Sequence, residues 1–339
     1  MNLIAWNCQG LGQPQTVRAL SELIRKERPS IVFLFETRLE DCRMEKLRKI
    51  LGFNSSYYVN PIGSAGGLGL WWRHEVEIQI LGSCRNFIDS FVLYPKDGLQ
   101  FRGSWFYGPP EIGRRRDFWE SLKGMDWKDG TPWLYIGDFN DFLWHHEKEG
   151  GAPSNPNRQR LLLQFMEDNA LWDLGFKGQK FTWRRIRYGE VYVQERLDRV
   201  LVNNDWLLHW PESRVNHEIH MGSDHCPLSL HLSPKQVLGP RPFSFESYWI
   251  DDDECHQIIK FGWQKMVPGG PAVNWVAKLD QCCKDLKTRS KTKYGNKKEQ
   301  LLTLSRRLEE IQGNIVQPEY LIEAEAISKS IDDLWKIEE

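Results

Sequence analysis

Short apolar runs alternate with helical patterns along the first part of the chain. The runs at 3–6 and 31–35 have the length and continuous apolar character of buried strands. Between them, Pro14 opens a stretch in which apolar residues recur every three or four positions, which is typical of an amphipathic helix. A second helical pattern follows Asp41 and stops at Gly52. The chain therefore begins with alternating strands and helices.

Residues 57–107 change to strands separated by glycine turns, and the alternation continues after them. A hairpin with arms at 181–187 and 191–202 is expected. The other predicted strands are 57–59, 68–72, 76–81, 87–93, 101–107, 133–136 and 228–232, and the predicted helices of this part are 116–122 and 158–170. Because about ten strands are too many for one simple parallel sheet, we expect an α/β protein with two packed sheets and helices outside.

The character of the sequence changes after residue 232. The segment 233–253 is rich in Pro, Ser and acidic residues, which predicts a linker. In 254–339 apolar residues step by three and four along two runs that Gly313 and Pro318 separate. We therefore predict a first domain over 1–232 and a tail over 254–339 that forms a helical hairpin or short coiled coil.

Charge gives no global sign of a nucleic-acid partner. The formal net charge is −1, so contact with a polyanion must come from local clusters. Arginines crowd the tip of the predicted hairpin, which makes it the strongest candidate, whereas a solvated charged face is the alternative for every cluster. The clusters are Arg184, Arg185 and Arg187; Arg114, Arg115 and Arg116; and Lys287, Arg289, Lys291, Lys293, Lys297 and Lys298.

Cysteine usage and the first residues indicate a nuclear or cytoplasmic protein. The seven cysteines are odd in number and scattered, without a CxxC pair, which favours reduced thiols over a disulfide framework. The first apolar run has no charged region and long apolar stretch before it, so we expect no signal peptide and no secretion. No apolar run approaches the roughly 20 residues of a membrane helix, so no membrane partner is expected.

Acidic, amide and imidazole side chains stand where apolar runs end. Hydrolysis of a phosphodiester needs a cation to neutralise charge, a base to orient or deprotonate water, and a donor for the phosphoryl oxygens. Asp138 and Asn140 follow the strand at 133–136, and in extended geometry positions i and i+2 face the same side. The carboxylate would hold a water and the amide would donate to a phosphate oxygen. The alternative is an Asx turn that closes the strand.

A second pair of such groups is Asp224 and His225. The carboxylate could bind a metal beside the imidazole, and the alternative is a turn with a capping aspartate. Asp198 lies in an otherwise apolar stretch, and a buried carboxylate needs a partner. His225 is the candidate partner, and this pairing would keep the imidazole protonated for phosphate binding. Local pairing of Asp198 with Arg196 or Arg199 is the alternative.

Four further residues carry less information singly. Glu36 follows a buried strand, so it is either a metal ligand at the rim of a sheet or a surface glutamate. The Tyr107 hydroxyl could donate to a phosphate, but the residue could equally be part of an aromatic core. Asn7 ends the first strand, and the alternative is a turn asparagine. Thr182 is the weakest of the four.

Taken in order, these strings resemble the endonuclease/exonuclease/phosphatase superfamily. The chain is similar in particular to the apurinic-endonuclease-like domain of LINE-type (non-LTR) retrotransposons of plants, strongly over 1–232 and loosely in the tail. The strings that carry the resemblance are Asn7, Phe35-Glu36-Thr37, Tyr107-Gly108, Gly137-Asp138-Phe139-Asn140, Phe181-Thr182-Trp183, Arg196-Leu197-Asp198-Arg199 and Ser223-Asp224-His225.

The resemblance implies a four-layer sandwich of two packed mixed β-sheets flanked by helices, with the site at one edge and a C-terminal helical segment added. It implies Mg²⁺ or Mn²⁺ held by Glu36 with help from Asn7 and Asp224. It further implies catalytic roles for the water-activating, phosphate-orienting and phosphate-binding residues, and contact of the hairpin region with DNA. The residues concerned are Asp138, Asn140, His225, Asp198 and Tyr107 for catalysis, and Thr182, Arg184, Arg185 and Arg187 for substrate binding.

Two positions depart from the pattern of the superfamily. Phe35 stands where many members carry a polar residue, and Gln9 stands where DNA-repair members carry an acidic one, which makes strict abasic-site repair less expected. No polymerase motif occurs, so an element-derived reading frame would be truncated or domesticated.

The leading hypothesis is a Mg²⁺-dependent DNA endonuclease of retrotransposon origin that nicks its substrate. One alternative is a phosphoesterase of the same fold acting on a small-molecule or lipid phosphate. Another is an inactive, domesticated nucleic-acid-binding protein. In each case the helical tail is a candidate for a protein contact or for self-association.

Overall fold

The computed structural model describes the chain in two compact units. One comprises Met1–Gln236 with Glu309–Ala324, and the other Val237–Leu308 with Glu325–Glu339. The described residues are 1–63, 65–122, 130–153, 159–187, 190–232, 245, 252–268, 270–313 and 318–336, without the side chains of 190, 290–298 and 318. Most of the expected linker 233–253 and the expected hairpin turn at 188–189 therefore lie outside the described residues, as do the side chains of most of the lysine-rich cluster.

The first sheet of the first unit is a mixed seven-stranded sheet with the order β11-β15-β16-β1-β2-β4-β3. Its centre is the parallel pair β1 (Asn2–Asn7) and β2 (Ile31–Phe35), whose apolar residues 3–6 and 31–35 are buried on both faces. The other strands are β3 (Ser55–Val59), β4 (Leu68–Trp72), β11 (Lys177–Gly178), β15 (Arg214–His217) and β16 (Leu228–His231).

The second sheet has six strands in the order β10-β14-β8-β7-β6-β5. β7 (Leu99–Tyr107) is parallel to β8 (Trp133–Asp138), whereas β14 (Asp198–Val202) is antiparallel to β8. Its remaining strands are β5 (Glu77–Cys84), β6 (Phe87–Tyr94) and β10 (Trp172–Asp173), and a separate three-stranded sheet contains β12 (Trp183–Arg187), β13 (Glu190–Glu195) and β9 (Lys148–Gly150).

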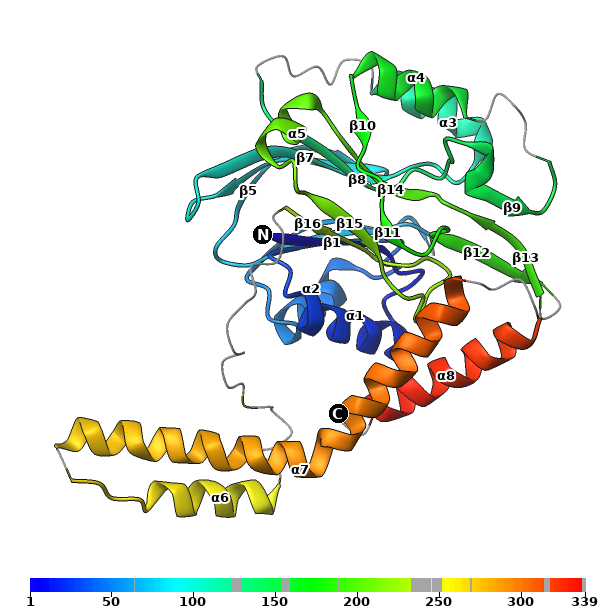
Figure 1. Ribbon diagram of the computed structural model, residues 1–339. Helices are drawn as coiled ribbons and strands as arrows, with labels where there is room; N and C mark the ends of the chain where they lie inside the picture. The colour runs from blue at the N-terminus through cyan, green and yellow to red at the C-terminus, as the bar shows by residue number, and fades with distance from the viewer. Residues whose placement is uncertain are drawn as a thin grey trace. The chain divides into compact units, whose positions relative to one another are not determined.

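Helices cover the outer faces of the two large sheets (Figure 1). α1 (Pro14–Glu27) and α2 (Asp41–Ile50) lie beside the seven-stranded sheet, and α3 (Ile112–Ser121) and α4 (Arg160–Asp168) beside the six-stranded sheet. α5 (Asn204–His209) instead contributes Trp206 to the core between the two sheets. Two mixed sheets flanked by helices confirm the predicted fold class. A short 3₁₀ turn, η1 (His145–Glu147), precedes β9.

The main core lies between the two large sheets. Alternation along β7 places Trp105 and Tyr107 in this core, with Phe33 of β2 facing them from the other sheet. Phe106, which points the other way, packs instead in the cluster under α3 and α4 with Phe118 and others. The central strands β7, β8 and β14 thus contribute to two apolar layers, which explains why they are buried on both faces.

The expected hairpin arm at 191–202 is two strands that belong to different sheets. The chain leaves the three-stranded sheet after Glu195 and enters the six-stranded sheet at Asp198. The amide groups of Leu197 and Asp198 both donate to Thr182 Oγ1 at this crossing. Polar and charged residues dominate positions 194–199, and the prediction of one continuous arm did not take this interruption into account. The strands β9, β10, β11 and β15 and the helix α5 were also not predicted.

The C-terminal part contains the helices α6 (Asp253–Trp263), α7 (Pro271–Gly313) and α8 (Pro318–Lys336). In the second unit, Cys255 of α6 and Leu286 of α7 belong to one buried apolar cluster. Arg289 is also buried and pairs with Asp252. In the described part of the chain, no helix is long and apolar enough to cross a membrane. All seven cysteines are free thiols.

Candidate active site

Polar residues from five strands gather at one edge of the paired sheets. Asn7 is the last residue of β1, and Glu36 directly follows β2. Tyr107 ends β7 and lies opposite Asp138, which ends the parallel strand β8. Asp198 begins the antiparallel strand β14 and also lies opposite Asp138. Because parallel strands present their carboxyl ends at the same edge, residues from distant parts of the sequence meet there.

Glycine at position 137 allows this arrangement. Gly137 has a φ of +140°, and a Cβ there would lie 1.9 Å from the carbonyl oxygen of Phe106. Only glycine permits β8 to approach β7 this closely just before the aspartate. The position of Asp138 at the edge therefore depends on the residue that precedes it.

The chain turns sharply after Asp138. The Asn140 amide N–H donates to Asp138 Oδ1 at 2.6 Å, and Asn140 has a φ of 54°. This is an Asx turn, so the extended geometry that was expected to align the two side chains is absent. The Asn140 side chain donates instead to the Gly108 carbonyl at 2.8 Å, which joins the loop after β8 to the loop after β7.

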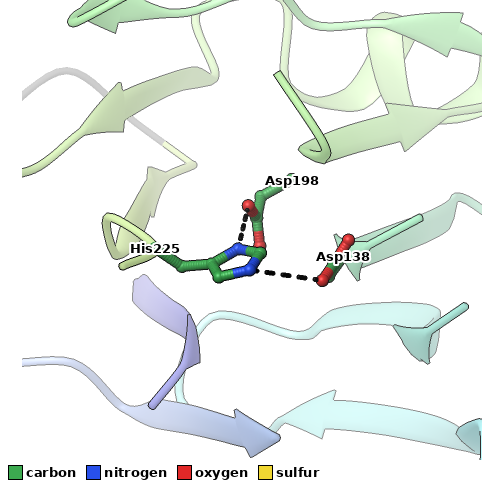
Figure 2. Close-up of side chains that lie close together, drawn as sticks. All are labelled: Asp138, Asp198 and His225. Atoms are coloured by element: carbon green, nitrogen blue, oxygen red, sulfur yellow. Dashed lines mark hydrogen bonds and ion pairs between the residues drawn. The ribbon is translucent and has the colours of Figure 1, made fainter. Parts of the chain in front are cut away.

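The His225 imidazole lies between two buried carboxylates (Figure 2). Its Nδ1 is 2.8 Å from Asp198 Oδ2, and its Nε2 is 3.9 Å from Asp138 Oδ2. Asn7 Nδ2 donates to Asp138 Oδ2 at 3.2 Å and lies 3.4 Å from His225 Nε2. All four side chains are at most 3 % exposed. The structure thus brings these four predicted site residues together.

Burial and mutual charge set the protonation of this group. Burial disfavours the charged imidazole, but Asp198, through charge and its hydrogen bond, and then Asp138 raise the pKa of His225 to about 10. Burial, followed by the charge of Asp198, raises the pKa of Asp138 to about 7, although His225 opposes the shift. At neutral pH the imidazole is therefore protonated, and Asp138 can exchange a proton with a bound water.

Local pairing of Asp198 with arginine does not occur. Arg196 and Arg199 point instead to a buried network with Glu147 and Asp173. Arg199 Nη2 lies 3.0 Å from Glu147 Oε2, and Arg196 Nη2 lies 2.8 Å from Asp173 Oδ1. The Asp198 side chain is thereby left to the imidazole.

Glu36 and Tyr107 form the other side of the edge. The Tyr107 hydroxyl donates to Glu36 Oε1, and Arg38 donates to Glu36 Oε2 at 2.6 Å. Burial, and then the charge of Glu36, raises the pKa of Tyr107 well above its usual value, so the hydroxyl stays a donor. Arg38 also donates to Gln9 at 2.5 Å. This arginine was not predicted, although it stands two residues after Glu36 in the sequence.

Asp224 is exposed and is oriented by a tryptophan. Trp183 Nε1 donates to Asp224 Oδ2 at 2.9 Å, and the Arg184 amide donates to the Asp224 carbonyl at 3.2 Å. Residues 183 and 225 also form an isolated β-bridge, so the base of the β12–β13 pair is fixed beside His225. Trp183 belongs to the segment Phe181-Thr182-Trp183 that carries part of the family resemblance, but no role was predicted for it.

The remaining predicted contact residues lie in different environments. Thr182 is fully buried, and its hydroxyl accepts the amides of Leu197 and Asp198 at 2.9 Å each. Arg185 and Arg187 are exposed on β12, and Arg184 is half-buried. In the second basic cluster, Arg115 is buried and donates to the carbonyls of Pro109 and Pro110, so it is not available to a ligand.

The carboxylate and amide oxygens at this edge, from Glu36, Asn7, Asp138 and Asp224, are of the kind that suits a hard divalent cation. Among the described His, Cys, Asp and Glu residues, Asp138, Asp198 and His225 are the one group of three whose ligand atoms lie within 4.8 Å of one another. The raised pKa of Asp138 reflects two neighbouring carboxylates in a buried place, and a cation would relieve this repulsion. Carboxylate and amide oxygens are the ligands that Mg²⁺ prefers.

Comparison with known proteins gives a family and a fold. Residues 4–225 match the model of the Endonuclease/Exonuclease/phosphatase family. No curated protein matches the chain. The fold is similar to that of the AP endonuclease LMAP from Leishmania major, with a TM-score of 0.52 and 14 % identity over 68 % of this chain and 86 % of that chain.

Two further structures share this fold. The 3′-5′ exonuclease NExo from Neisseria meningitidis has a TM-score of 0.51 and 17 % identity over 69 % of this chain and 100 % of that chain. The endonuclease domain of TRAS1, a telomere-specific non-LTR retrotransposon, has a TM-score of 0.50 and 16 % identity over 69 % of this chain and 99 % of that chain.

Proposed function

Because the chain belongs to the endonuclease/exonuclease/phosphatase family, we propose that it is a metal-dependent DNA endonuclease that hydrolyses a phosphodiester and nicks one strand. The observation that carries this proposal is the His225 imidazolium held between Asp198 and Asp138. Two exposed arginines, Arg185 and Arg187, lie on the strand that begins beside it. A protonated donor, a poised carboxylate and an adjacent basic strand suit an extended phosphodiester.

The residues have separate tasks in this proposal. Asp138 orients the attacking water and takes its proton, because its pKa of about 7 lets it do so near neutral pH. His225, kept charged by Asp198, donates to a phosphoryl oxygen where negative charge develops. Tyr107 assists with its hydroxyl. Asn140 orients the phosphate, a role supported by its position in the turn directly after Asp138.

We place the metal, Mg²⁺ or Mn²⁺, on the Glu36 side of the edge, with Asn7 and Asp224 as further ligands. Both ring nitrogens of His225 face carboxylates, and a protonated imidazole cannot bind a metal. When bound, the cation neutralises phosphate charge and lowers the pKa of a bound water. The Arg38 guanidinium now pairs with Glu36, so cation binding and this ion pair compete for one oxygen.

DNA contact is proposed for the β12–β13 pair. Arg184, Arg185 and Arg187 would track phosphates, with Thr182 at the base of the strand. We further propose that the chain derives from a LINE-type retrotransposon of plants and acts in the nucleus or cytoplasm. This origin rests on the sequence strings that resemble that group.

Supercoiled plasmid incubated with Mg²⁺ tests the proposal. We expect open-circle product that a chelator abolishes and that His225→Ala reduces by about 10²–10⁴-fold. His74→Ala is the matched control, because His74 is largely exposed and distant in sequence from the edge.

Three other outcomes would contradict the proposal in whole or in part. DNA binding without nicking would favour the inactive binding protein. Phosphate release from a phosphoinositide or sugar phosphate, without nicking, would favour the small-molecule phosphoesterase. Equal nicking by the His225→Ala and His74→Ala variants would remove His225 from the mechanism.

A further inference from the structure

A glutamine of the C-terminal helices reaches the strands of the catalytic unit. Gln312, near the end of α7, belongs to the same compact unit as β1 and β8, and its side chain is only 8 % exposed. Its Oε1 accepts the His220 amide at 3.0 Å and Gln179 Nε2 at 2.8 Å. Its Nε2 donates to the His220 carbonyl at 3.1 Å. One side chain therefore pairs with both backbone groups of His220.

His220 lies in the loop that carries two of the proposed functional residues. This active-site loop, residues 218–227, joins β15 to β16 and contains Asp224 and His225. Its base is closed by the Glu218 amide, which donates to the Pro227 carbonyl at 2.9 Å. Buried backbone groups need partners, and at His220 the α7 side chain supplies both of them. We call the contacts of Gln312 with His220 and Gln179 the clasp. The clasp fixes the loop a few residues before Asp224.

The next contacts along the loop leave it little freedom. Gly222 has a φ of +73°, and a Cβ there would lie 2.9 Å from Thr16 Cα on α1. The Thr16 hydroxyl donates to the Gly222 carbonyl at 2.7 Å, and the Ser223 hydroxyl donates to the Asn7 carbonyl at 2.7 Å. With His220 held by α7 and Gly222 held by α1, the path of the chain into His225 is set from both helices.

The clasp comes from a part of the chain that the family match does not include. The match ends at residue 225, well before Gln312. Two apolar residues near the clasp, Ile311 of α7 and Leu321 of α8, are nevertheless buried, at 2 % and 4 % exposed. Gln179, whose side chain donates to Gln312, is buried as well, and its backbone carbonyl accepts from His217 Nδ1 at 2.6 Å.

We propose that Gln312 is a positioning residue: its amide holds the active-site loop in the conformation that sets Asp224 and His225 for catalysis. The C-terminal segment is then part of the working nuclease, although the family match stops before it. The consequence for catalysis rests on the proposed DNA cleavage, whereas the consequence for the loop does not.

The test compares three full-length variants with the wild type. Gln312→Met keeps the length of the side chain and removes the amide. Gln312→Glu keeps an acceptor for the His220 amide but loses the donor. Gln300→Met makes the same change at an exposed position of the same helix. Hydrogen–deuterium exchange of a peptide covering 218–227 reports on the loop, and plasmid nicking gives kcat and KM.

For Gln312→Met we expect exchange in this peptide to be about tenfold faster and kcat about tenfold lower, with KM nearly unchanged. Gln312→Glu should lie between Gln312→Met and wild type, and Gln300→Met should equal wild type. Wild-type exchange and kcat in Gln312→Met would overturn the proposal. Faster exchange throughout both sheets would also overturn it, because the role would then be general stability. If loop exchange is faster in Gln312→Met but the wild-type protein nicks no plasmid, the positioning of the loop by Gln312 stands and the proposed function is rejected.

Discussion

Two clusters of charged side chains meet at one strand, β14, and differ in how the charge of their carboxylates is balanced. Asp198 and Arg199 are successive residues of β14, and successive side chains of a strand point to opposite faces. Asp198 belongs to the group at the sheet edge, with Asp138 and His225. Arg199 belongs to a network in which two guanidinium groups meet two carboxylates, Glu147 and Asp173.

The balance of charge separates a structural network from a candidate site. In the network, burial alone would raise the pKa of Asp173, but Arg199 and Arg196 lower it to about 2, and Glu147 is lowered in the same way. At the edge, burial and Asp198 raise the pKa of Asp138 to about 7. Compensated carboxylates stabilise the fold, whereas the under-compensated one favours uptake of a proton or a cation.

The largest expected effect is the loss of activity in Asp138→Asn. This variant removes the proposed base but keeps an oxygen that can accept from Asn7, so nicking should fall by about 10³-fold while the protein remains folded. Plasmid nicking and thermal unfolding measure the two quantities. Asp97→Asn, an exposed aspartate, is the control. If unfolding of the Asp138→Asn variant accounts for its loss of activity, Asp138 has a structural role like that of the Glu147–Asp173 network.

The second prediction concerns the network. Arg199→Met removes one of the two buried guanidinium groups that pair with Glu147 and Asp173. We therefore expect a loss of about 3–5 kcal/mol in the free energy of unfolding. Urea unfolding measures it, with the exposed Arg43→Met as control. A loss below about 1 kcal/mol, the value of a surface pair, would show that the network does not stabilise the fold.

The two groups should also respond to pH with opposite signs. Asp173 has a folded pKa of about 2 against about 3.9 when unfolded, so its stabilisation is present above about pH 4 and is lost as pH falls through about 2. Asp138 has a folded pKa of about 7, so its contribution is present below about pH 4 and is lost as pH rises through about 7.

This difference is measurable by urea unfolding at a series of pH values. The unfolding free energy of Asp138→Asn, relative to wild type, should rise between about pH 4 and pH 7. Arg199→Met should weaken the dependence below about pH 4. A constant difference between Asp138→Asn and wild type across this range would mean that Asp138 is balanced in the way that Asp173 is.

The smallest expected effect is that of Thr182→Val, which acts on the strand that both groups share. The variant leaves the buried amides of Leu197 and Asp198 without their acceptor, at a cost of about 1–3 kcal/mol. Thermal unfolding and nicking kinetics measure the result, and Thr182→Ser, which restores the hydroxyl, should recover most of it. A contact of Thr182 with DNA alone would instead raise KM and leave stability unchanged.

Periodicity identified the elements whose pattern is strong and local. The bounds of β2 and β4 agree with the predicted runs, because a short apolar run bounded by turn residues is typical of a buried strand. The crossing at Leu197 was missed because the apolar residues on either side of the polar segment 194–199 were joined into one predicted arm. Short strands such as β11 carry too few residues for a period to appear.

The candidate site was predicted less evenly. Asp138, Asp198 and His225 meet as the order of the strings implied. Asn140 was expected in extended geometry, but the Asx turn competes successfully for its amide. Trp183 and Arg38 were not assigned roles, because a hydrogen bond to Asp224 or Glu36 depends on where loops pass one another.

The order of residues along the chain is enough to predict which side-chain types stand at the ends of the buried strands, and with them the fold class and the chemistry available there. How the charges are shared depends on the packed fold: Asp198 pairs with the imidazole, Arg199 pairs with Asp173, and Gln312 pairs with His220. The reason is that strand and helix patterns arise from neighbours in sequence, whereas burial and pairing of charge depend on groups brought together by the packed sheets.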